Sequence, residues 1–443
     1  MRPRSRFRSA ARGAHQPPAV ASEGVATVRI DRLAAGGDGV ARIDGLACFV
    51  PRTAPGDLVQ VAYAAHARYA RGRVLQRLES GPDRIEAPCR HYEADRCGGC
   101  QLQHLEATAQ REARRVIVRD ALLRVAKREI VLPELVAGKE WGYRERLTLA
   151  LRLKGVTWIG GLHAHDDGGR VFALDECAIA DPRLVDAWTA VKRVLKGLPR
   201  VPSDHTLRLS LRLAAASTEG SAPRIALVII GGTRWPEAKA WAESIHDTLA
   251  MVSSVWWEAT GGEVAHLAGD ADATSLSFAQ VNPTMALALR DHVVATMTAL
   301  APRRVVDAYS GRGELAVLLA GAGIDVTAIE ADANATAVAS ARLSPFTASR
   351  VITGLVEDAL PGALPTDVVV LNPPRRGLDP RVAATLAEAR STKTIVYVSC
   401  DPATLARDLS RMPHWHLSSI KCFDMFPQTA HVETVCVLTP NFP

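Results

Sequence analysis

Aromatic side chains and long apolar runs are both scarce in this chain of 443 residues. Phenylalanine, tryptophan and tyrosine together make up 5% of the residues, so the hydrophobic cores must be built mainly from alanine, valine and leucine. No apolar run reaches the roughly 18 residues that a membrane-spanning helix requires. We therefore expect a soluble, cytoplasmic protein of several domains with no membrane partner.

Cysteine is too sparse for a disulfide scaffold, because only eight cysteines are spread over the chain. Three of them, Cys89, Cys97 and Cys100, nevertheless fall close together, and this crowding indicates a metal site. Gly98-Gly99 between the last two supplies the backbone freedom that a ligand turn needs. With Cys177 as a candidate fourth thiolate, the set fits either a 4Fe-4S cluster or zinc.

Acidic residues are slightly fewer than basic ones, and the 47 Asp and Glu against 53 Lys and Arg give a formal net charge of +6. This balance is typical of a protein with a polyanionic partner, although a mildly basic enzyme would show it too. Residues 1–22 carry five arginines and no acid. We expect a disordered basic tail there, since it lacks the apolar core of a secretory signal.

The remaining sequence divides into three regions. Short β-like runs broken by glycines predict a small OB-like β-barrel over 23–81, a type that often binds oligonucleotides. Residues 82–275 contain the cysteine motif and have the pattern of a mixed α/β central domain. Over 276–443, buried-strand runs alternate with alanine-rich helical stretches, which predicts an α/β fold with a doubly wound, Rossmann-like parallel sheet. The runs are Arg304–Ala308, Asp325–Glu330, Asp367–Leu371 and Thr394–Ser399. Two final runs, Trp415–Phe423 and His431–Leu438, would add an antiparallel pair at one edge.

A glycine-rich loop follows the first strand of that sheet, at the carboxyl end where doubly wound folds bind ligands. Gly311 and Gly313 would let a nucleoside approach the backbone, and Glu330 after the next strand could bind ribose hydroxyls. A phosphate-binding GK[ST] loop is absent, so a triphosphate ligand is not expected. These residues alone favour S-adenosylmethionine, NAD and an ordinary loop about equally.

Asn372-Pro373-Pro374-Arg375 closes another strand of the same sheet. A rigid Pro-Pro turn would hold the amide over the same crevice, as in the motif with which amino methyltransferases bind an exocyclic nitrogen. An ordinary strand-ending turn is the alternative.

Cys400 and Glu433 are candidate catalytic residues. Cys400 follows a buried strand and precedes a predicted helix, whose dipole would stabilise a thiolate nucleophile, although a buried structural cysteine would fit equally well. Glu433 lies in an otherwise apolar run, Val432–Leu438, where an unpaired carboxylate is expensive and should have a partner or a function. A strand-edge carboxylate that faces water is the alternative.

Five stretches occur in the same order as motifs of one known family. They are residues 30–88, Cys97-Gly98-Gly99-Cys100-Gln101, Phe278-Ala279-Gln280-Val281-Asn282-Pro283, Ser399-Cys400-Asp401-Pro402-Ala403-Thr404-Leu405, and Asp424-Met425-Phe426-Pro427 with His431-Val432-Glu433. Together they resemble the RNA uracil-5-methyltransferase family, and the resemblance covers nearly the whole chain from about residue 23.

The resemblance implies a TRAM-type RNA-binding barrel, a 4Fe-4S cluster and methyl transfer from S-adenosylmethionine to uracil C5. Cys400 would attack uracil C6, and Glu433 would remove the C5 proton so that β-elimination releases the enzyme. Gln280 could also read the edge of the flipped base. The implied S-adenosylmethionine residues are Gln280, Asp307, Tyr309, Gly311, Gly313, Glu330 and Asn372, and the implied cluster ligands are Cys89, Cys97, Cys100 and Cys177.

The basic barrel and tail, together with the cluster motif, favour rRNA over tRNA as the substrate, and we expect a monomer. A tRNA uracil-5-methyltransferase and an amino methyltransferase that uses Asn372 are the enzymatic alternatives. A non-enzymatic RNA-binding factor is the least favoured, because Cys400 and Glu433 are both present.

Overall fold

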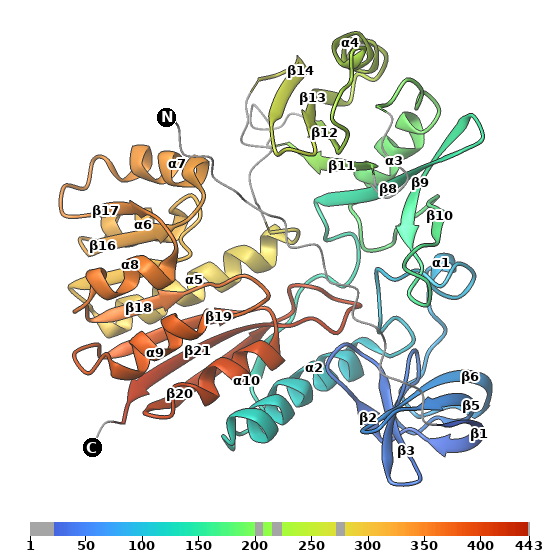
Figure 1. Cartoon of the computed structure of the whole chain (residues 1–443), viewed down its shortest axis with the longest axis horizontal. Coiled ribbons are helices and arrows are strands. Elements are labelled where there is room, and N and C mark those ends of the chain that lie inside the picture. The colour runs from blue at the N-terminus through green and yellow to red at the C-terminus, as the bar shows by residue number, and fades with distance from the viewer. Residues whose placement is uncertain (1–21, 200–206, 215–223, 272–279, 442–443) are drawn as a thin grey trace. The chain divides into compact units, whose positions relative to one another are not determined.

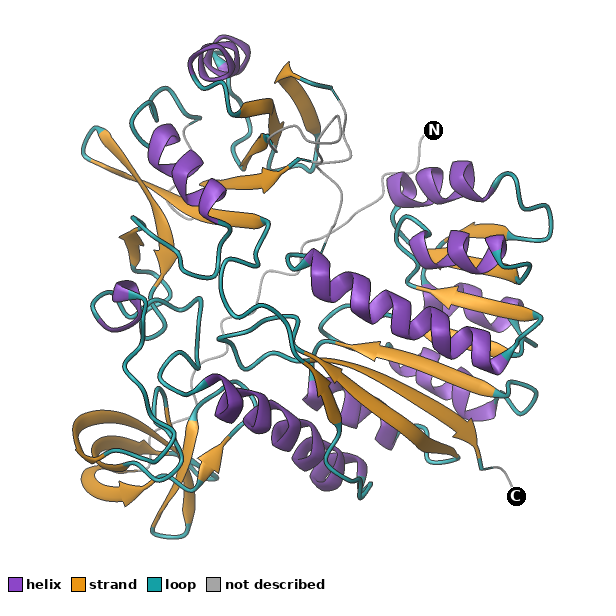
Figure 2. Ribbon diagram, turned by 180° about the vertical axis from the view of Figure 1, so that it is seen from behind, coloured by secondary structure: helices purple, strands orange, loops and turns teal. Residues whose placement is uncertain are grey.

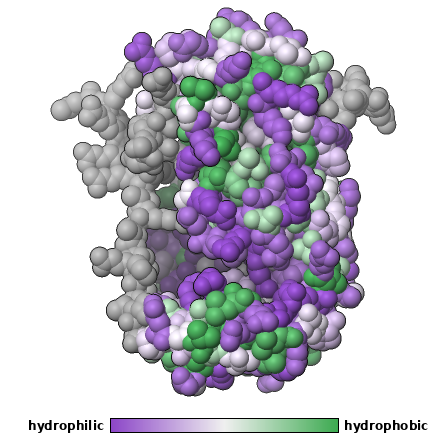
Figure 3. All heavy atoms as spheres, turned by 90° about the vertical axis from the view of Figure 1, so that its right-hand side faces the viewer, coloured by the Kyte–Doolittle hydropathy of each residue, from purple (hydrophilic) through white to green (hydrophobic). Residues whose placement is uncertain are grey.

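The computed structural model describes residues 22–199, 207–214, 224–271 and 280–441. Two compact units meet in sequence at the Arg84–Ile85 bond, and each is described by itself. Residues 1–21 of the predicted tail, and Phe278 and Ala279 of the third motif, lie outside the described residues. No helix of the described chain is both long and apolar enough to cross a membrane. On the face seen in Figure 3, hydrophilic and hydrophobic residues alternate over short distances.

The first unit is a six-stranded sheet in the order β1-β5-β6-β4-β3-β2, with only β4 and β6 paired in parallel. The glycines of residues 36–39 were expected to interrupt the strands. Of these, only Gly36 and Gly37 have positive φ, and Gly39 is the first residue of β3. The strands are β1 Ser22–Arg29, β2 Arg32–Leu33, β3 Gly39–Ile43, β4 Leu46–Val50, β5 Leu58–Ala65 and β6 Ala70–Glu79.

The second unit contains two sheets and the segment that joins them. The cysteine segment includes the short helix α1 (Arg90–Glu93). It is followed by α2 (Ala107–Ala121), which one π-helical turn, η1 (Leu122–Ala126), continues. Figure 1 shows α2 in cyan, close to β20 and α10 of the last part of the chain. Val118 and Leu122 pack into the same core as α10.

The first of these sheets has seven strands in the order β10-β9-β8-β11-β12-β13-β14, antiparallel except for β12 and β13. Alternate leucines of β8 and β11 are buried against helices α3 (Pro182–Val191) and α4 (Ala238–Thr248). The period of two leaves the other face of these strands for polar residues. The strands are β8 Arg146–Lys154, β9 Thr157–His163, β10 Val171–Ala173, β11 Leu207–Leu213, β12 Ile225–Ile230, β13 Val252–Glu258 and β14 Val264–Gly269.

The second sheet has eight strands in the order β17-β16-β15-β18-β19-β21-β20-β7. The first five strands are parallel and helices cover both faces, which confirms the doubly wound prediction (Figure 2). Helices α5, α6 and α7 pack on one face, and α8, α9 and α10 on the other. The strands are β15 Arg304–Ala308, β16 Asp325–Glu330, β17 Arg350–Thr353, β18 Val368–Leu371, β19 Thr394–Ser399, β20 Trp415–Phe423, β21 Glu433–Pro440 and β7 Glu134–Val136; the helices are α5 Pro283–Leu300, α6 Glu314–Gly321, α7 Ala333–Leu343, α8 Val356–Ala363, α9 Pro380–Glu388 and α10 Pro402–Ser410.

The antiparallel pair β20 and β21 exists, but it does not form the edge of the sheet. The three-residue strand β7 pairs in parallel with β20 and is the last strand on that side. A strand of three residues, nearly three hundred positions from its partner, carries no periodic signal that the sequence could show.

Candidate active site and cysteine pocket

The glycine loop after β15 is bound to the end of the neighbouring strand β16. Tyr309, Gly311 and Gly313 all have positive φ, at 63°, 55° and 72°. The Gly311 amide donates to Glu330 Oε2 at 3.0 Å, and Glu330 Oε1 accepts from the amide of Asp332 at 2.9 Å. Since a Cβ at Gly311 would meet no atom within 4 Å, backbone conformation rather than crowding requires glycine there. The loop is held in place while the space above Gly311 stays open.

Asp307 lies at the carboxyl end of β15 and is 3% exposed. Burial raises its pKa to about 7, and the charge of Glu330 adds to this shift, although a hydrogen bond from the Ala316 backbone opposes it. Its Oδ2 atom is buried and has no hydrogen-bond partner among the described residues. A buried acceptor without a donor at the ligand-binding end of a doubly wound sheet fits a polar group of a ligand.

Asn372 and Gln280 are the other predicted cofactor residues. The Asn372 amide donates to the carbonyl of Ala308 at 3.3 Å, which places the two strand ends side by side, and its side chain is exposed. Gln280 is half-buried at the start of a segment held to the last hairpin, because Asn282 Nδ2 donates to the Met425 carbonyl at 3.2 Å.

Cys400 and Glu433 lie at the ends of neighbouring strands. Ser399 of β19 pairs with Thr434 of β21 in antiparallel register, so the next step of that register places Cys400 across from Glu433. Glu433 is 5% exposed, and burial raises its pKa to about 7. Burial, and secondly the charge of Glu433, raises the pKa of Cys400 to about 11. The two groups therefore resist carrying negative charge at the same time.

The expected stabilisation of the Cys400 thiolate by the helix dipole is wrong for the ligand-free protein. The Asp401 side chain already accepts hydrogen bonds from the amides of Ala403 and Thr404, both at 2.9 Å, at the start of α10. Its carboxylate thus occupies the positive helix end and raises the pKa of the neighbouring thiol. With a pKa of about 11, the thiol is protonated at neutral pH.

Arg375 partly opposes the rise in the pKa of Cys400, and sequence reasoning gave it no role. Its guanidinium lowers the pKa of both Cys400 and Glu433, and it contributes to a lowered pKa at His431, where burial is the larger cause. The residue stands directly after Asn372-Pro373-Pro374, so the motif itself was a signal for it. The loop that carries Arg375 is tied to α10, because the Leu378 amide donates to buried Asp408 at 2.8 Å.

The loop between β20 and β21 leads to Glu433 and is anchored from several directions. Arg114 of α2 pairs with Asp424 at 2.9 Å, with both side chains 1% exposed, and also donates to the carbonyl of Thr429. The Gln428 carbonyl accepts from the amides of Gln101 and Leu102 at 3.1 and 3.0 Å. The cysteine segment therefore holds the hairpin that presents the candidate base.

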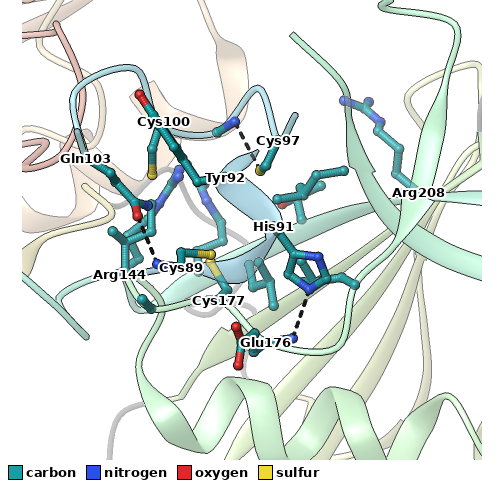
Figure 4. A pocket seen from close by; sticks show the side chains of 18 of the residues that line it. Cys89, His91, Tyr92, Cys97, Cys100, Gln103, Arg144, Glu176, Cys177 and Arg208 are labelled. Carbon is teal, nitrogen blue, oxygen red and sulfur yellow. Dashed lines mark hydrogen bonds between the residues drawn. The ribbon is translucent and has the colours of Figure 1, made fainter. Parts of the chain in front are cut away.

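The four predicted metal ligands line one cavity of about 390 Å³ in the second unit (Figure 4). Cys89, Cys97 and Cys100 come from the cysteine segment, and Cys177 comes from the loop before α3. Burial, and secondly the neighbouring thiols, raises the pKa of Cys100 to about 12, although its hydrogen bond with Gln103 opposes this. Among the residues that the structure describes, no group of three or more acidic, histidine or cysteine side chains is arranged to hold a metal ion.

Hydrogen bonds fix both segments that carry these cysteines. His91 Nε2 accepts from the amide of Asp175 at 3.3 Å, while its Nδ1 lies 2.6 Å from Asp95. The Gly99 amide donates to Cys97 Sγ at 3.4 Å. Backbone amides of 179 and 180 oppose the rise that burial causes in the pKa of Cys177. N–H groups directed at sulfur are the interactions that stabilise coordinated thiolates.

Comparisons with known proteins agree with this arrangement. The family model described as tRNA (Uracil-5-)-methyltransferase matches residues 356–441, and the TRAM domain model matches residues 25–75. An uncharacterized RNA methyltransferase of Gloeobacter violaceus is 32% identical over 96% of this chain and 98% of its own length. The 23S rRNA (uracil(1939)-C(5))-methyltransferase RlmD of Chromohalobacter salexigens is 30% identical over 97% of this chain and 96% of its own.

A solved structure supports the fold. The Pyrococcus abyssi tRNA (uracil-54, C5)-methyltransferase, in complex with S-adenosyl-L-homocysteine, superposes with a TM-score of 0.70 at 23% identity, over 94% of this chain and 100% of that chain. With the motif order, the doubly wound sheet and relatives of at least 30% identity over almost the whole length, the chain belongs to the RNA uracil-5-methyltransferase family.

Proposed function

We propose that this protein methylates C5 of a uridine in 23S ribosomal RNA through a covalent bond between Cys400 and uracil C6. The observation that carries the proposal is the strand register that sets Cys400 across from the buried carboxylate of Glu433. A thiol beside a carboxylate with a pKa of about 7 provides a nucleophile and a base that titrates near neutral pH.

In the first step, the Cys400 thiolate forms an S–C6 bond, and the electrons of the C5=C6 double bond move toward C5 and the O4 carbonyl. Arg375 favours this step in two ways, because its positive charge stabilises the thiolate before attack and the enolate after it. Bound S-adenosylmethionine supplies the methyl group that C5 takes up.

In the second step, Glu433 removes the proton from C5. The electron pair of that C–H bond restores the C5=C6 double bond, the S–C6 bond breaks, and Cys400 leaves as a thiolate. Burial makes the Glu433 carboxylate a stronger base than an exposed one. The anchored loop between β20 and β21 fixes the strand on which this base lies.

The crevice fits S-adenosylmethionine. We assign the open loop at Gly311 and the unsatisfied oxygen of Asp307 to its amino acid and nucleoside parts, with Glu330 at the ribose. Tyr309, Gly313, Asn372 and Gln280 complete the proposed set. We further propose that residues 23–81 and 82–275 bind and position RNA, and that residues 276–443 carry out catalysis.

The cysteine pocket fits a 4Fe-4S cluster. Four thiols line one cavity of about 390 Å³, and four cysteine thiolates are the usual ligand set of such a cluster. Cys89, Cys97, Cys100 and Cys177 would bind the cluster, which would cross-link the segment that holds Gln428 to the loop before α3. Anaerobically purified protein should contain about four irons per chain, and one zinc per chain without iron would contradict the cluster.

RNA in which 5-fluorouridine replaces uridine tests the covalent mechanism. The C5 fluorine cannot leave as a proton does, so elimination is blocked after methyl transfer and the Cys400–RNA bond should survive denaturing electrophoresis. We expect a slowly migrating band with 23S rRNA transcripts that requires S-adenosylmethionine and disappears in Cys400→Ala.

Cys48→Ala is a matched control, because Cys48 is a buried thiol of the first unit, and it should leave the band intact. A band with tRNA transcripts alone would make tRNA the substrate. Methyl transfer to RNA without any band would favour an amino methyltransferase that uses Asn372.

A further inference from the structure

Asp408 is a buried carboxylate on the apolar face of α10. The neighbouring Leu405 and Leu409 of the same helix pack into the core of the eight-stranded sheet, and Asp408 is fully buried with them. A position three residues after one buried leucine and directly before another is usually apolar in such a helix. A buried carboxylate is costly unless hydrogen bonds and opposite charges stabilise it, so the partners of Asp408 indicate its role.

A tight turn after β18 carries Arg375. The Gly377 amide donates to the carbonyl of Pro374 at 2.8 Å and closes a four-residue turn. Arg375 and Arg376 are the two central residues of this turn. Gly377 is buried and has a positive φ of 75°, and a Cβ there would overlap Asp408 Oδ2. The turn therefore packs directly on the buried carboxylate, which leaves room only for glycine.

Each carboxylate oxygen of Asp408 holds one part of this turn. Oδ2 accepts from the amide of Leu378, directly after the turn, at 2.8 Å. Oδ1 accepts from Arg407 Nη2 at 2.7 Å, and the same nitrogen donates to the carbonyl of Arg376 at 2.7 Å. These charge-assisted hydrogen bonds fix the backbone on both sides of Gly377.

The same carboxylate is bound to the strand that leads to Cys400. The Tyr397 hydroxyl donates to Asp408 Oδ2 at 2.9 Å, and Tyr397 is a fully buried residue of β19, three positions before Cys400. Strand β18, which ends just before the loop of Arg375, pairs in parallel with β19, with Leu371 beside Tyr397. Asp408 therefore connects the turn of Arg375 to the strand end of the thiol on which the charge of Arg375 acts.

We propose that Asp408 is a positioning residue that fixes the turn of Arg375 relative to Cys400 and so keeps the positive charge of Arg375 acting on the reacting thiol. The inference rests on the proposed function in taking Cys400 as the nucleophile. It gives the buried acid of α10 a part in the reaction that is exerted through Arg375.

The test is the rate at which iodoacetamide alkylates Cys400 in the full-length protein without RNA, measured by mass spectrometry of the Cys400 peptide at about pH 9. The thiolate is the form that reacts, so the rate reports how readily the thiol ionises. We expect Asp408→Asn to react about threefold to tenfold more slowly than the wild type, because the thiolate is less populated once the charge of Arg375 is no longer held in place.

The sign of the change separates this role from a direct effect of charge. The side chains that most affect the pKa of Cys400 are Glu433, Arg375 and Asp401. Removing a nearby acid lowers the pKa of a thiol and speeds its alkylation, and local unfolding that exposes the thiol speeds it as well. A folded Asp408→Asn protein that reacts as fast as the wild type, or faster, would overturn the proposal.

Gly377→Ala tests the same turn with every charge in place. Its Cβ would displace the turn from Asp408, so alkylation should slow in this variant even if Asp408→Asn does not fold. Asp367→Asn is the matched control, because Asp367 accepts hydrogen bonds from two backbone amides at the amino end of β18. It should lower the melting temperature and leave the alkylation rate unchanged. An unchanged rate in Gly377→Ala, or an equal fall in Asp367→Asn, would contradict the positioning role.

A double variant tests whether Asp408 acts through Arg375. Arg375→Met should itself slow alkylation, and adding Asp408→Asn to it should slow the reaction no further, because the charge to be positioned is gone. Additive losses would show that Asp408 acts independently of Arg375 and would overturn the proposal. Because alkylation needs neither RNA nor methyl transfer, a wild-type protein that fails to methylate RNA would count against the proposed function and leave this comparison intact.

Discussion

The candidate active site and the cysteine pocket both contain a thiol whose pKa is raised by burial, and they differ in what surrounds the sulfur. The pKa is raised to about 11 at Cys400 and to about 12 at Cys100. Around Cys400 stand the carboxylates of Glu433 and Asp401 and the guanidinium of Arg375. Around Cys100 and its partners stand other thiols, and Cys97 and Cys177 accept backbone N–H groups.

A raised pKa does not by itself decide what a thiol does. Under the proposed function, Cys400 loses its proton as a nucleophile toward the substrate, and Arg375 partly opposes the effect of burial on its pKa. The pocket cysteines would instead lose their protons together on binding an ion or a cluster. The loop between β20 and β21 links the two regions, because the cysteine segment donates hydrogen bonds to Gln428 and Glu433 follows five residues later.

Removing the Cys400 thiol should distinguish the two regions most strongly. We expect Cys400→Ala to lower the rate of uracil methylation by about 10⁴-fold or more, since the reaction has no other nucleophile. Its iron content should equal that of the wild type. A Cys400→Ala protein that still methylates C5 at a measurable fraction of the wild-type rate would contradict the assignment of the two thiol types.

Glu433→Gln should be the next most severe change. Loss of a general base costs about 10²- to 10⁴-fold in rate, and methylated RNA should accumulate as a covalent adduct on Cys400, visible by denaturing electrophoresis with ordinary RNA. Asp401→Asn removes the other acid beside Cys400 and should give no such adduct. Slow turnover by Glu433→Gln without any adduct would show that another residue removes the C5 proton.

The raised pKa of Glu433 also predicts opposite pH dependences for activity and stability. Activity should rise as the pH increases through about 7, because the base must be ionised. The pKa of Glu433 in the folded protein lies above its ordinary value of 4.5, so the native state binds more protons than the unfolded state. The contribution of Glu433 to stability is therefore lost as the pH rises from 4.5 through 7. Urea unfolding should show that Glu433→Gln is more stable than wild type at pH 8 and no more stable at pH 4.

Arg114→Met should destabilise the hairpin that joins the two regions. It leaves Asp424 buried without its ion-pair partner, which costs about 3 to 5 kcal/mol of unfolding free energy. Arg119→Met, on the same helix, removes an exposed pair with Asp120 and should change stability by less than about 1 kcal/mol. Equal effects in urea unfolding would show that the buried pair is not the anchor.

Cys177→Ser should have the smallest effect on catalysis. We expect the iron content to fall below that of the wild type and methylation to decline by less than about tenfold, because the hydrogen bonds to Gln428 come from Gln101 and Leu102 rather than from the thiol. Hydrogen exchange should be faster over 424–432 than in the wild type. Unchanged hydrogen exchange in a variant that has lost iron would show that the cysteine pocket does not stabilise the hairpin.

Much of the catalytic sheet could be predicted from the sequence, because its strands are continuous apolar runs. The runs Arg304–Ala308, Asp325–Glu330 and Thr394–Ser399 match β15, β16 and β19 residue for residue. Long-range partners could not be predicted in the same way. The bond from Gln110 to Gln428 joins residues 318 positions apart, and local periodicity carries no information about such a pair.

The candidate site shows the same division. Strand ends place Asp307, Asn372 and Cys400 at one edge of the sheet, as parallel topology requires. The direction of the Cys400 pKa shift was wrong because it depends on which acids lie near the thiol, and Glu433 reaches it from another strand. Arg375 had no assigned role for the same reason, since its influence on both residues arises only in the folded chain.

The most direct test of the account is tritium release from rRNA and tRNA transcripts labelled at uracil C5, with wild-type protein and Cys400→Ala. The account predicts release from 23S rRNA that requires S-adenosylmethionine and is lost in the variant. Methyl incorporation without tritium release, or release that persists in Cys400→Ala, would contradict it.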